Sequence, residues 1–339
     1  MKKYTFKFIS ILIGLASFTF MFSGCNKKSE VIVYANDSFA AEWGPAPEIA
    51  KRFREETGLT VTFVSCGNAG ETLRRAILEK DSPQADILVG VDDTLYEQAK
   101  EADIFKPYKP ANAESLIEPE VLSAFGNEWL VTPYDYGCFA MIYDTQSTLP
   151  APEKLEDLTK DIYRQSVIIM SPETSTAGLG FLAWTVAQFP DSYIDFWTKF
   201  TPNIFRMTNG WSEGWGFFTS GEAPLVISYT TSPAYNVIVE KETRFKTIIF
   251  PEGHIEQVEG FGLLKNAPNE KEAKIFMDFM LSEKAQSVLP ETQWMYPSNK
   301  NIELSQEFVQ SSPKPAAVLS VDSKKVTEAI PEVLKIVQQ

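Results

Sequence analysis

The sequence contains few of the residues from which metal sites and many catalytic centres are built. A single histidine, His254, stands among 339 residues, so most histidine-based metal sites are excluded. We expect His254 to have a structural role in a turn. Cysteine occurs three times without a CxxC spacing. No Ser-, Gly- or Gln-rich tract is present and hydrophobic residues make up 44%, which excludes a mainly disordered or fibrous chain.

Basic residues are outnumbered by acidic residues. Lys and Arg total 31 and Asp and Glu total 45, which gives a formal net charge of −14. An acidic surface repels the phosphate backbone of nucleic acids, so we expect no nucleic-acid partner. A small cation is the better electrostatic match.

The apolar run at the N-terminus is too short for a comfortable membrane span, which needs about 20 residues. It follows a lysine-rich start, and two small residues then precede Cys25, as in bacterial lipoproteins. We expect residues 1–24 to be a signal peptide, residues 25–30 a tether, and Cys25 the lipidated residue. The mature protein would then be periplasmic and lipid-anchored to the cell membrane. An ordinary secretory signal with an incidental cysteine is the alternative.

The other two cysteines, Cys66 and Cys138, have no ligand set nearby in the sequence. In an oxidising compartment they could form a disulfide. Two buried free thiols are the other interpretation.

Strands and helices alternate along the first part of the chain. Residues 31–36, 59–64 and 85–92 predict strands, and residues 45–58 and 70–80 predict the helices between them. This β-α-β-α-β order predicts a parallel sheet with right-handed crossovers.

A second α/β series follows an extended crossing at residues 129–144. Its strands are expected at residues 167–171, 224–231 and 245–250, and its helices at residues 175–189, 193–200 and 232–242. The chain then returns through an extended segment and ends in an amphipathic helix, at residues 259–265 and 270–289. Residues 105–120 and 296–315 are expected to be loops.

Two such series predict an α/β protein of two lobes, each a sheet flanked by helices. We expect lobe 1 to comprise residues 31–136 and about 256–339, and lobe 2 to comprise residues 137–255. Ligands of open α/β sheets bind at the carboxyl ends of the strands, so the cleft between the lobes is the expected site. Hinges are expected at about residues 136–142 and 250–260.

Aromatic residues gather in the polar turns that follow the strands. These residues are Trp43, Trp211, Trp215, Tyr229, Tyr235 and Trp294. Rings that face a cleft can stack on a planar heterocycle, and each can hold a cation by its π face with about 0.5–2 kcal/mol. The set predicts a site for an aromatic cation. Ser175 and Thr176 open a helix whose free N–H groups suit a hydroxyl or phosphate, although simple capping explains them as well.

Seven segments resemble, in the same order, the periplasmic thiamine-binding proteins of bacterial ABC importers. They are D-S-F-A-A-x-W-G-P (37–45), D-Y-G-x-F-A (135–140), T-S-T-x-G-L-G (174–180), G-W-S-E (210–213), S-Y-T-T-S-P-A-Y (228–235), E-G-H-x-x-Q-V-E (252–259) and W-M-Y-P (294–297). The resemblance implies a type II periplasmic-binding-protein fold. It also implies a monomer without a cofactor that captures thiamine, thiamine monophosphate or thiamine diphosphate. A membrane permease with its ATPase would then receive the ligand.

The ligand residues of that family can be carried over by position. The resemblance implies ligand contacts at Trp43, Asn68, Ala69, Ser175, Thr176, Trp211, Tyr229, Thr230, Thr231, Ser232, Pro233, Tyr235 and Trp294. The chain departs from the family pattern at Asn36 and Cys138, where rings are usual, and at Asn68–Ala69, where Asp-Gly is usual. The missing carboxylate would need a replacement, for which the candidates are Glu71, Asp92 and Asp135.

Other functions remain open at this point. A thiaminase of the same architecture would use Cys138 as its nucleophile with a glutamate base. A ferric-ion binding protein would use Tyr229 and Tyr235 as phenolate ligands. The aromatic set also permits another quaternary cation such as choline.

Overall fold

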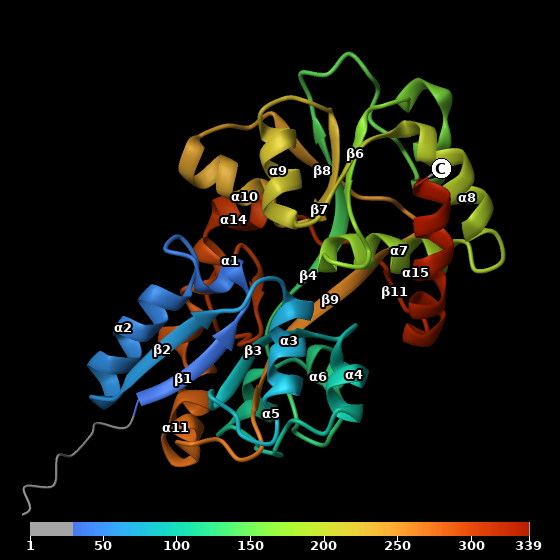
Figure 1. Cartoon of the computed structure of the whole chain (residues 1–339). Helices are drawn as coiled ribbons and strands as arrows, with labels where there is room; N and C mark the ends of the chain where they lie inside the picture. Colours follow the sequence, from blue (N-terminus) through green and yellow to red (C-terminus); the bar gives the residue numbers. More distant parts are fainter. Residues whose placement is uncertain (1–29, 339) are drawn as a thin grey trace, which may run out of the picture.

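One continuous β-sheet runs through both halves of the molecule (Figure 1). The computed structural model describes residues 30–338, so the predicted signal peptide and Cys25 lie outside the described residues. The strand order is β2-β1-β3-β9-β4-β7-β5-β6, with β8 and β10 paired to β4 and β11 paired to β9. The sheet therefore carries the chain from one half to the other without a break.

The first half confirms the predicted parallel β-α-β-α-β series. Its strands are β1 (Glu30–Ala35), β2 (Thr60–Ser65) and β3 (Ile87–Asp92). Strand β1 pairs in parallel with both others. Its helices are α1 (Asp37–Ala40), α2 (Ala46–Thr57), α3 (Ala69–Leu78), α4 (Tyr96–Glu101), α5 (Ala113–Leu116) and α6 (Pro119–Leu122). Helix α2 ends at Gly58, whose left-handed φ of 72° suits a residue without a Cβ.

The second half contains the predicted strands and helices and two elements that were missed. Its strands are β5 (Val167–Met170), β6 (Ile204–Thr208), β7 (Leu225–Tyr229) and β8 (Phe245–Ile248). Its helices are α7 (Thr176–Gln188), α8 (Tyr193–Phe200), α9 (Trp211–Thr219) and α10 (Pro233–Tyr235), which continues as a π-helical turn through Glu240.

The missed elements are β6 and α9. Two glycines lower the helix propensity of the α9 sequence, so the sequence pattern predicted a turn there. Tertiary packing favours the helix despite its low propensity, because Gly214 lets α9 lie close to β5. A Cβ on Gly214 would come within 2.5 Å of the Met170 side chain.

Two long strands join the halves, β4 (Thr132–Asp144) and β9 (His254–Leu263). Strand β4 pairs with β9 as far as Cys138, and from Phe139 onward it pairs with β7. The change of partner falls inside the predicted hinge at residues 136–142. Hinge motion itself stays a prediction.

A further crossing near the C-terminus was not expected. After α14 (Gln306–Ser311) the chain passes through β11 (Val318–Leu319) to α15 (Ser323–Val337). Helix α15 packs on α7 and α8, and its Val326, Ala329 and Val333 belong to the second core. Figure 1 shows α15 in red beside α8. The lobe boundaries stay a prediction, but this packing leads us to group α15 with the second lobe rather than the first.

The predicted helix 270–289 is wrong as a single element. The segment forms α11 (Glu270–Met280), α12 (Glu283–Gln286) and α13 (Leu289–Thr292), followed by β10 (Tyr296–Pro297). Ser282 breaks the helix because its side chain accepts a hydrogen bond from the N–H of Ala285 and starts α12. The amide of Asn299 donates to the carbonyl of Leu281 and completes the end of α11.

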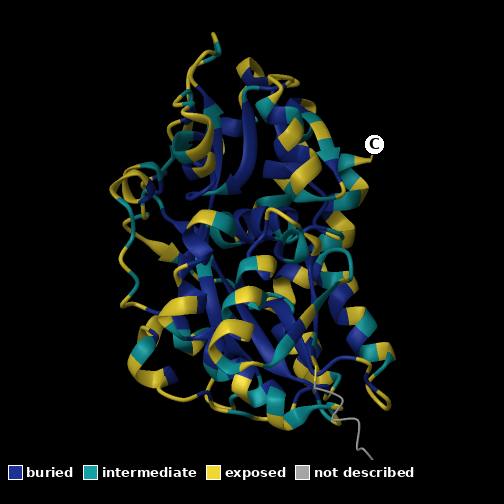
Figure 2. Ribbon diagram, turned by 90° about the vertical axis from the view of Figure 1, so that its left-hand side faces the viewer, coloured by how far each residue is buried: buried dark blue, intermediate teal, exposed yellow. Residues whose placement is uncertain are grey.

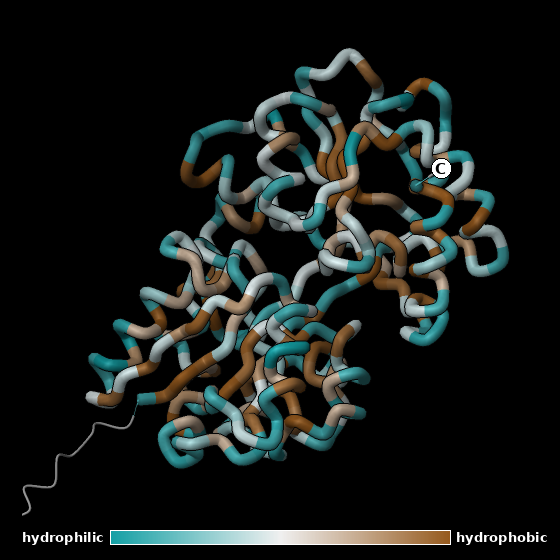
Figure 3. Tube along the Cα trace, in the orientation of Figure 1, coloured by the Kyte–Doolittle hydropathy of each residue, from teal (hydrophilic) through white to brown (hydrophobic). Residues whose placement is uncertain are grey.

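Each half has its own hydrophobic core, and the strands lie at the centre of both (Figures 2 and 3). Of the helices in residues 30–338, none has the length and apolar character needed to cross a bilayer. Cys66 and Cys138 are both free thiols.

His254 ties the two crossings together, as its predicted structural role requires. The N–H of Phe250 donates to Nε2 at 2.8 Å, so Nδ1 carries the proton and donates to the carbonyl of Phe139 at 2.7 Å. The ring is fully buried against Trp184, with 4.6 Å between ring centroids. Burial lowers the pKa of His254, so the neutral ring is the folded form.

Replacement of His254 by alanine should lower the free energy of unfolding by roughly 2–4 kcal/mol, because two buried backbone groups lose their partner and a cavity forms. Since the folded protein disfavours the charged ring, the wild-type advantage should be complete above about pH 6.5 and shrink as the pH falls below it. Urea unfolding of both proteins across this range measures the difference. A difference that stays constant with pH would contradict the neutral-ring assignment.

Candidate functional site

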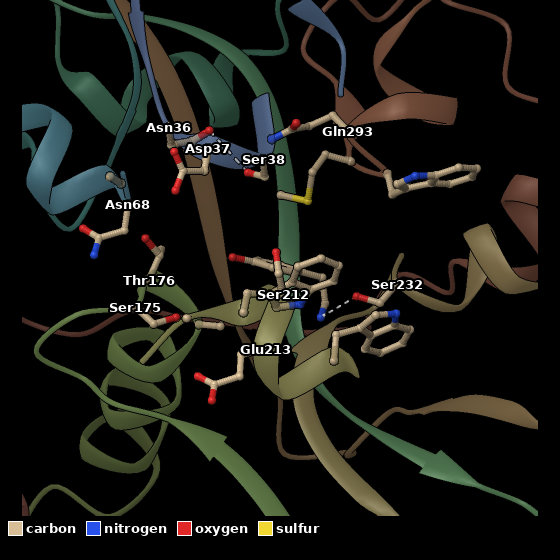
Figure 4. Close-up of a pocket in the computed structure, with 18 of the residues that line it drawn as sticks. Asn36, Asp37, Ser38, Asn68, Ser175, Thr176, Ser212, Glu213, Ser232 and Gln293 are labelled. Carbon is tan, nitrogen blue, oxygen red and sulfur yellow. Dashed lines mark hydrogen bonds between the residues drawn. The ribbon is translucent and has the colours of Figure 1, made fainter. Parts of the chain in front are cut away.

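A cavity of about 790 Å³ lies between the two halves (Figure 4). Asn36, Asp37, Ser38 and Asn68 line it from the first half. In Figure 4 they face a group from the second half that includes Ser175, Thr176, Ser212 and Glu213. The carboxyl ends of β1, β2, β5 and β7 all lead into it, as expected for an open α/β sheet.

The structure brings most of the predicted site residues to this cavity. Those that line it are Trp43, Asn68, Ala69, Ser175, Thr176, Trp211, Tyr229, Ser232, Tyr235 and Trp294. Thr230, Thr231 and Pro233, which belong to the turn after β7 and the start of α10, do not line it. Thr231 is fully buried, and Thr230 lines a separate small cavity. The lining residues are therefore candidates by position, and their roles stay predictions.

Stacked indole rings form one wall of the cavity. Trp211 and Trp215 lie 5.6 Å apart between ring centroids and only 12° from parallel. The Nε1 of Trp211 donates to the hydroxyl of Ser228 at 2.7 Å, and that hydroxyl bonds to Ser232 at 2.6 Å. These bonds fix the indole, so its face is held toward the cavity before any ligand enters.

A second pair of rings lies across the cavity. Tyr235 meets Trp294 edge to face, with 5.4 Å between ring centroids. Trp294 adopts a left-handed φ of 57°, a conformation that costs a bulky residue of order 1–3 kcal/mol. Strain of this kind concentrates at binding sites, where the fold holds a side chain in a required position. Trp43 is 56% exposed at the cavity entrance, although it is a large apolar ring.

Helices α3, α7 and α9 all begin at the cavity, and only the first of these has a side-chain cap. Asn68 and Glu71 form a reciprocal capping box at the start of α3. No side chain caps α7 or α9. Their free N–H groups and positive dipole ends are therefore available at the cavity wall. Ser175 does not cap α7, and Thr176 donates instead to Asp92 at 3.0 Å.

The acidic residues of the lining were not those considered as replacements for the missing carboxylate. Glu71 is engaged by the N–H of Asn68 at 2.9 Å, and Asp92 and Asp135 are buried beneath the surface. The carboxylates that line the cavity are Asp37, Glu213, Glu259 and Glu291. The first three stand inside the motif segments, so the signal was present in the sequence. No lysine, arginine or histidine occurs among the described residues of the lining.

Cys138 lies outside this cavity. It shares a small cavity of about 90 Å³ with Thr230 and Glu256, while its neighbour Gly137 faces Tyr229 and Met295 on the other side of β4. Burial raises the pKa of the Cys138 thiol to about 12. Within residues 30–338, no group of three or more His, Cys, Asp or Glu side chains is placed to hold a metal ion.

Curated relatives match the chain over most of its length. The thiamine-binding periplasmic protein of Brucella melitensis is 34% identical over 96% of this chain and 93% of its own. That of Salmonella typhimurium is 35% identical over 88% of this chain and 89% of its own. A solved structure named periplasmic thiamin binding protein is 33% identical, covers 93% of this chain and 98% of its own, and superposes with a TM-score of 0.85.

The structural likeness identifies the two-lobed type II periplasmic-binding-protein fold that the sequence predicted. The model of the bacterial extracellular solute-binding proteins matches residues 82–328. This chain therefore belongs to the family of bacterial extracellular solute-binding proteins.

Proposed function

We propose that this protein is the substrate-binding component of an ABC importer and that it captures thiamine in the cavity between its lobes. One observation carries the proposal: ring faces and carboxylates line the cavity, and no basic side chain occurs in the described lining. Thiamine carries a cationic thiazolium ring and an aminopyrimidine ring, each planar and joined by a methylene group, so each of its features has a partner there. The names of the relatives point to the same ligand.

The rings and the acidic residues recognise different parts of the ligand. The stacked pair Trp211 and Trp215 and the pair Tyr235 and Trp294 hold the two heterocycles. The lining carboxylates balance the charge of the thiazolium ring. The hydroxyethyl arm, or the phosphate of a thiamine ester, turns to the uncapped N-termini of α7 and α9, beside Ser175 and Ser212.

Delivery completes the proposed function. The lobes close about the ligand by bending where β4 exchanges β9 for β7, and the closed form docks on a membrane permease driven by its ATPase. The protein works as a periplasmic monomer, tethered by a lipid on Cys25. A cavity that needs only one chain supports the monomer.

The geometry does not favour the alternatives. A thiaminase nucleophile needs a depressed pKa and access to the ligand, whereas the Cys138 thiol is 6% exposed, has a raised pKa and faces a different cavity. A ferric site on Tyr229 and Tyr235 lacks an imidazole, because both ring nitrogens of His254 are engaged in the core. Choline would occupy only part of a cavity of about 790 Å³.

Calorimetric titration of the soluble part with thiamine should show saturable binding to one site. The Trp211→Leu substitution should weaken the affinity by roughly 10- to 100-fold, because a ring face and its contact with the cation are lost. Trp129→Leu is the matched control, since Trp129 lies outside the cavity against the first core. An equal loss in both variants, or binding of choline as strong as that of thiamine, would speak against the proposed site.

Thiamine incubated with the protein and an amine acceptor should be recovered intact by mass spectrometry. The Cys138→Ser protein should bind thiamine as the wild type does, because the thiol faces away from the ligand. Appearance of the free thiazole would overturn the binding-protein assignment in favour of the enzyme.

A further inference from the structure

Three carboxyl groups form a row across adjacent strands beneath the cavity. Asp92 of β3 and Asp135 of β4 each pair in register with Glu259 of β9. Residues directly opposite one another in a sheet point to the same face, so the three side chains lie next to each other. Glu259 reaches the cavity lining, and it connects the other two acids to the ligand site.

The row is buried, and the described residues supply no counter-charge to it. Asp92 and Asp135 are fully buried, and Glu259 is 7% exposed. In the described chain, residues 30–338, no ion pair involves any of the three. Both carboxyl oxygens of Asp135 are buried without a hydrogen-bond donor among the described residues. An unpaired buried carboxylate is costly, so the arrangement requires either a proton or a cation.

Neutral donors form hydrogen bonds to some of the carboxyl oxygens of the row but not to all of them. Tyr134 and Gln293 both donate to Oε2 of Glu259, at 3.3 and 3.2 Å. Thr176 of α7 donates to Asp92, so the row also touches the second half of the molecule. These bonds hold the carboxyls in place without supplying positive charge.

Among the described residues, the titratable neighbours of the row are carboxyl or phenol groups, none of which carries positive charge. Asp93 follows Asp92 on the chain, Tyr134 adjoins on β4, and Tyr229 faces from β7. The cavity above adds Asp37, Glu213 and Glu291. Burial raises the pKa of Asp92, Asp135 and Glu259, that of Asp135 well above its usual value, and the charge of a neighbouring carboxylate adds to the rise at Asp135 and Glu259. The pKa of Asp93 rises to about 8 for the same reasons.

We propose that the row Asp92–Glu259–Asp135 stores a proton in the empty protein and releases it when the ligand's fixed positive charge enters the cavity. This inference rests on the proposed function, because it takes thiamine as the cation. The O–H bond of one carboxylic acid breaks, the proton passes to water, and the carboxylate left behind balances the thiazolium. Capture of the vitamin is thereby coupled to proton release.

The direction of the pH dependence follows from the position of the proton. The bound cation favours the ionised row, so the pKa of the row is lower in the complex than in the empty protein. Affinity is then greatest above the pKa of the empty protein and falls as the pH drops below it, by about tenfold per pH unit for one proton. The thiazolium nitrogen is quaternary and carries no proton, so at a pH where the aminopyrimidine ring also binds none, this slope comes from the protein.

Calorimetry of the exported chain with thiamine in HEPES and in Tris tests the proposal. These buffers differ in ionisation enthalpy, so the difference in heat counts the protons released per ligand. The titrations are made where potentiometry shows that free thiamine binds no proton. We expect release of up to one proton and an affinity that rises with pH. The Glu259→Gln and Asp135→Asn variants should each release fewer protons and show a flatter pH profile.

Asp278→Asn is the matched control. It removes a carboxylate that accepts from Tyr108 and Ala111, outside the cavity lining, and should leave both readouts unchanged. If either Glu259→Gln or Asp135→Asn fails to fold, the other variant and the number of protons released by the wild type still test the proposal. Thiamine binding without proton release, or release unchanged in both row variants, overturns this inference alone. No thiamine binding at any pH overturns the proposed function as well.

Discussion

The antiparallel pair of β4 and β9 is the contact on which the rest of the molecule depends. Both strands pass from one half to the other, and β4 pairs with β9 up to Cys138 and with β7 and β8 beyond it. Because parallel strands of each half end at this crossing, their loops are forced to meet across one cavity. The buried His254 ring fastens the second crossing to the first. A ligand that touches both sets of loops can therefore bias the angle between the lobes.

Charge gives the cavity its chemical character. Acids line it, further acids lie beneath it, and the described lining offers no basic side chain. Aromatic faces add a surface that attracts cations without the desolvation cost of another carboxylate. In the proposed mechanism a proton neutralises the buried acids in the empty protein, and the cation takes over that role in the complex. Free N–H groups at α7 and α9 provide a positive dipole end beside the described lining, which suits the polar arm of the same ligand.

Sequence patterns predicted the parts of the fold that local periodicity controls. The first β-α-β-α-β series and the helices α7 and α8 matched their patterns. Helix α9 was missed because Gly214 and Gly216 weaken the helical signal, and the close approach to β5 that requires Gly214 is a tertiary contact. The single helix expected at residues 270–289 was broken by the cap at Ser282, and α15 joined the second core through contacts distant in sequence.

The candidate site was predictable as a set of turns, whereas the acids inside the motif segments could not be ranked from the sequence. Trp211, Tyr235 and Trp294 could be named because bulky rings in polar turns lack a local explanation. Glu259 could not be chosen over Asp135 or Asp92, since their alignment depends on the pairing of β3, β9 and β4. The most direct test of the central claim is mass spectrometry of the small molecule released on denaturing freshly purified protein. The account predicts thiamine or one of its phosphate esters, and recovery of ferric ion or an unrelated anionic solute would contradict it.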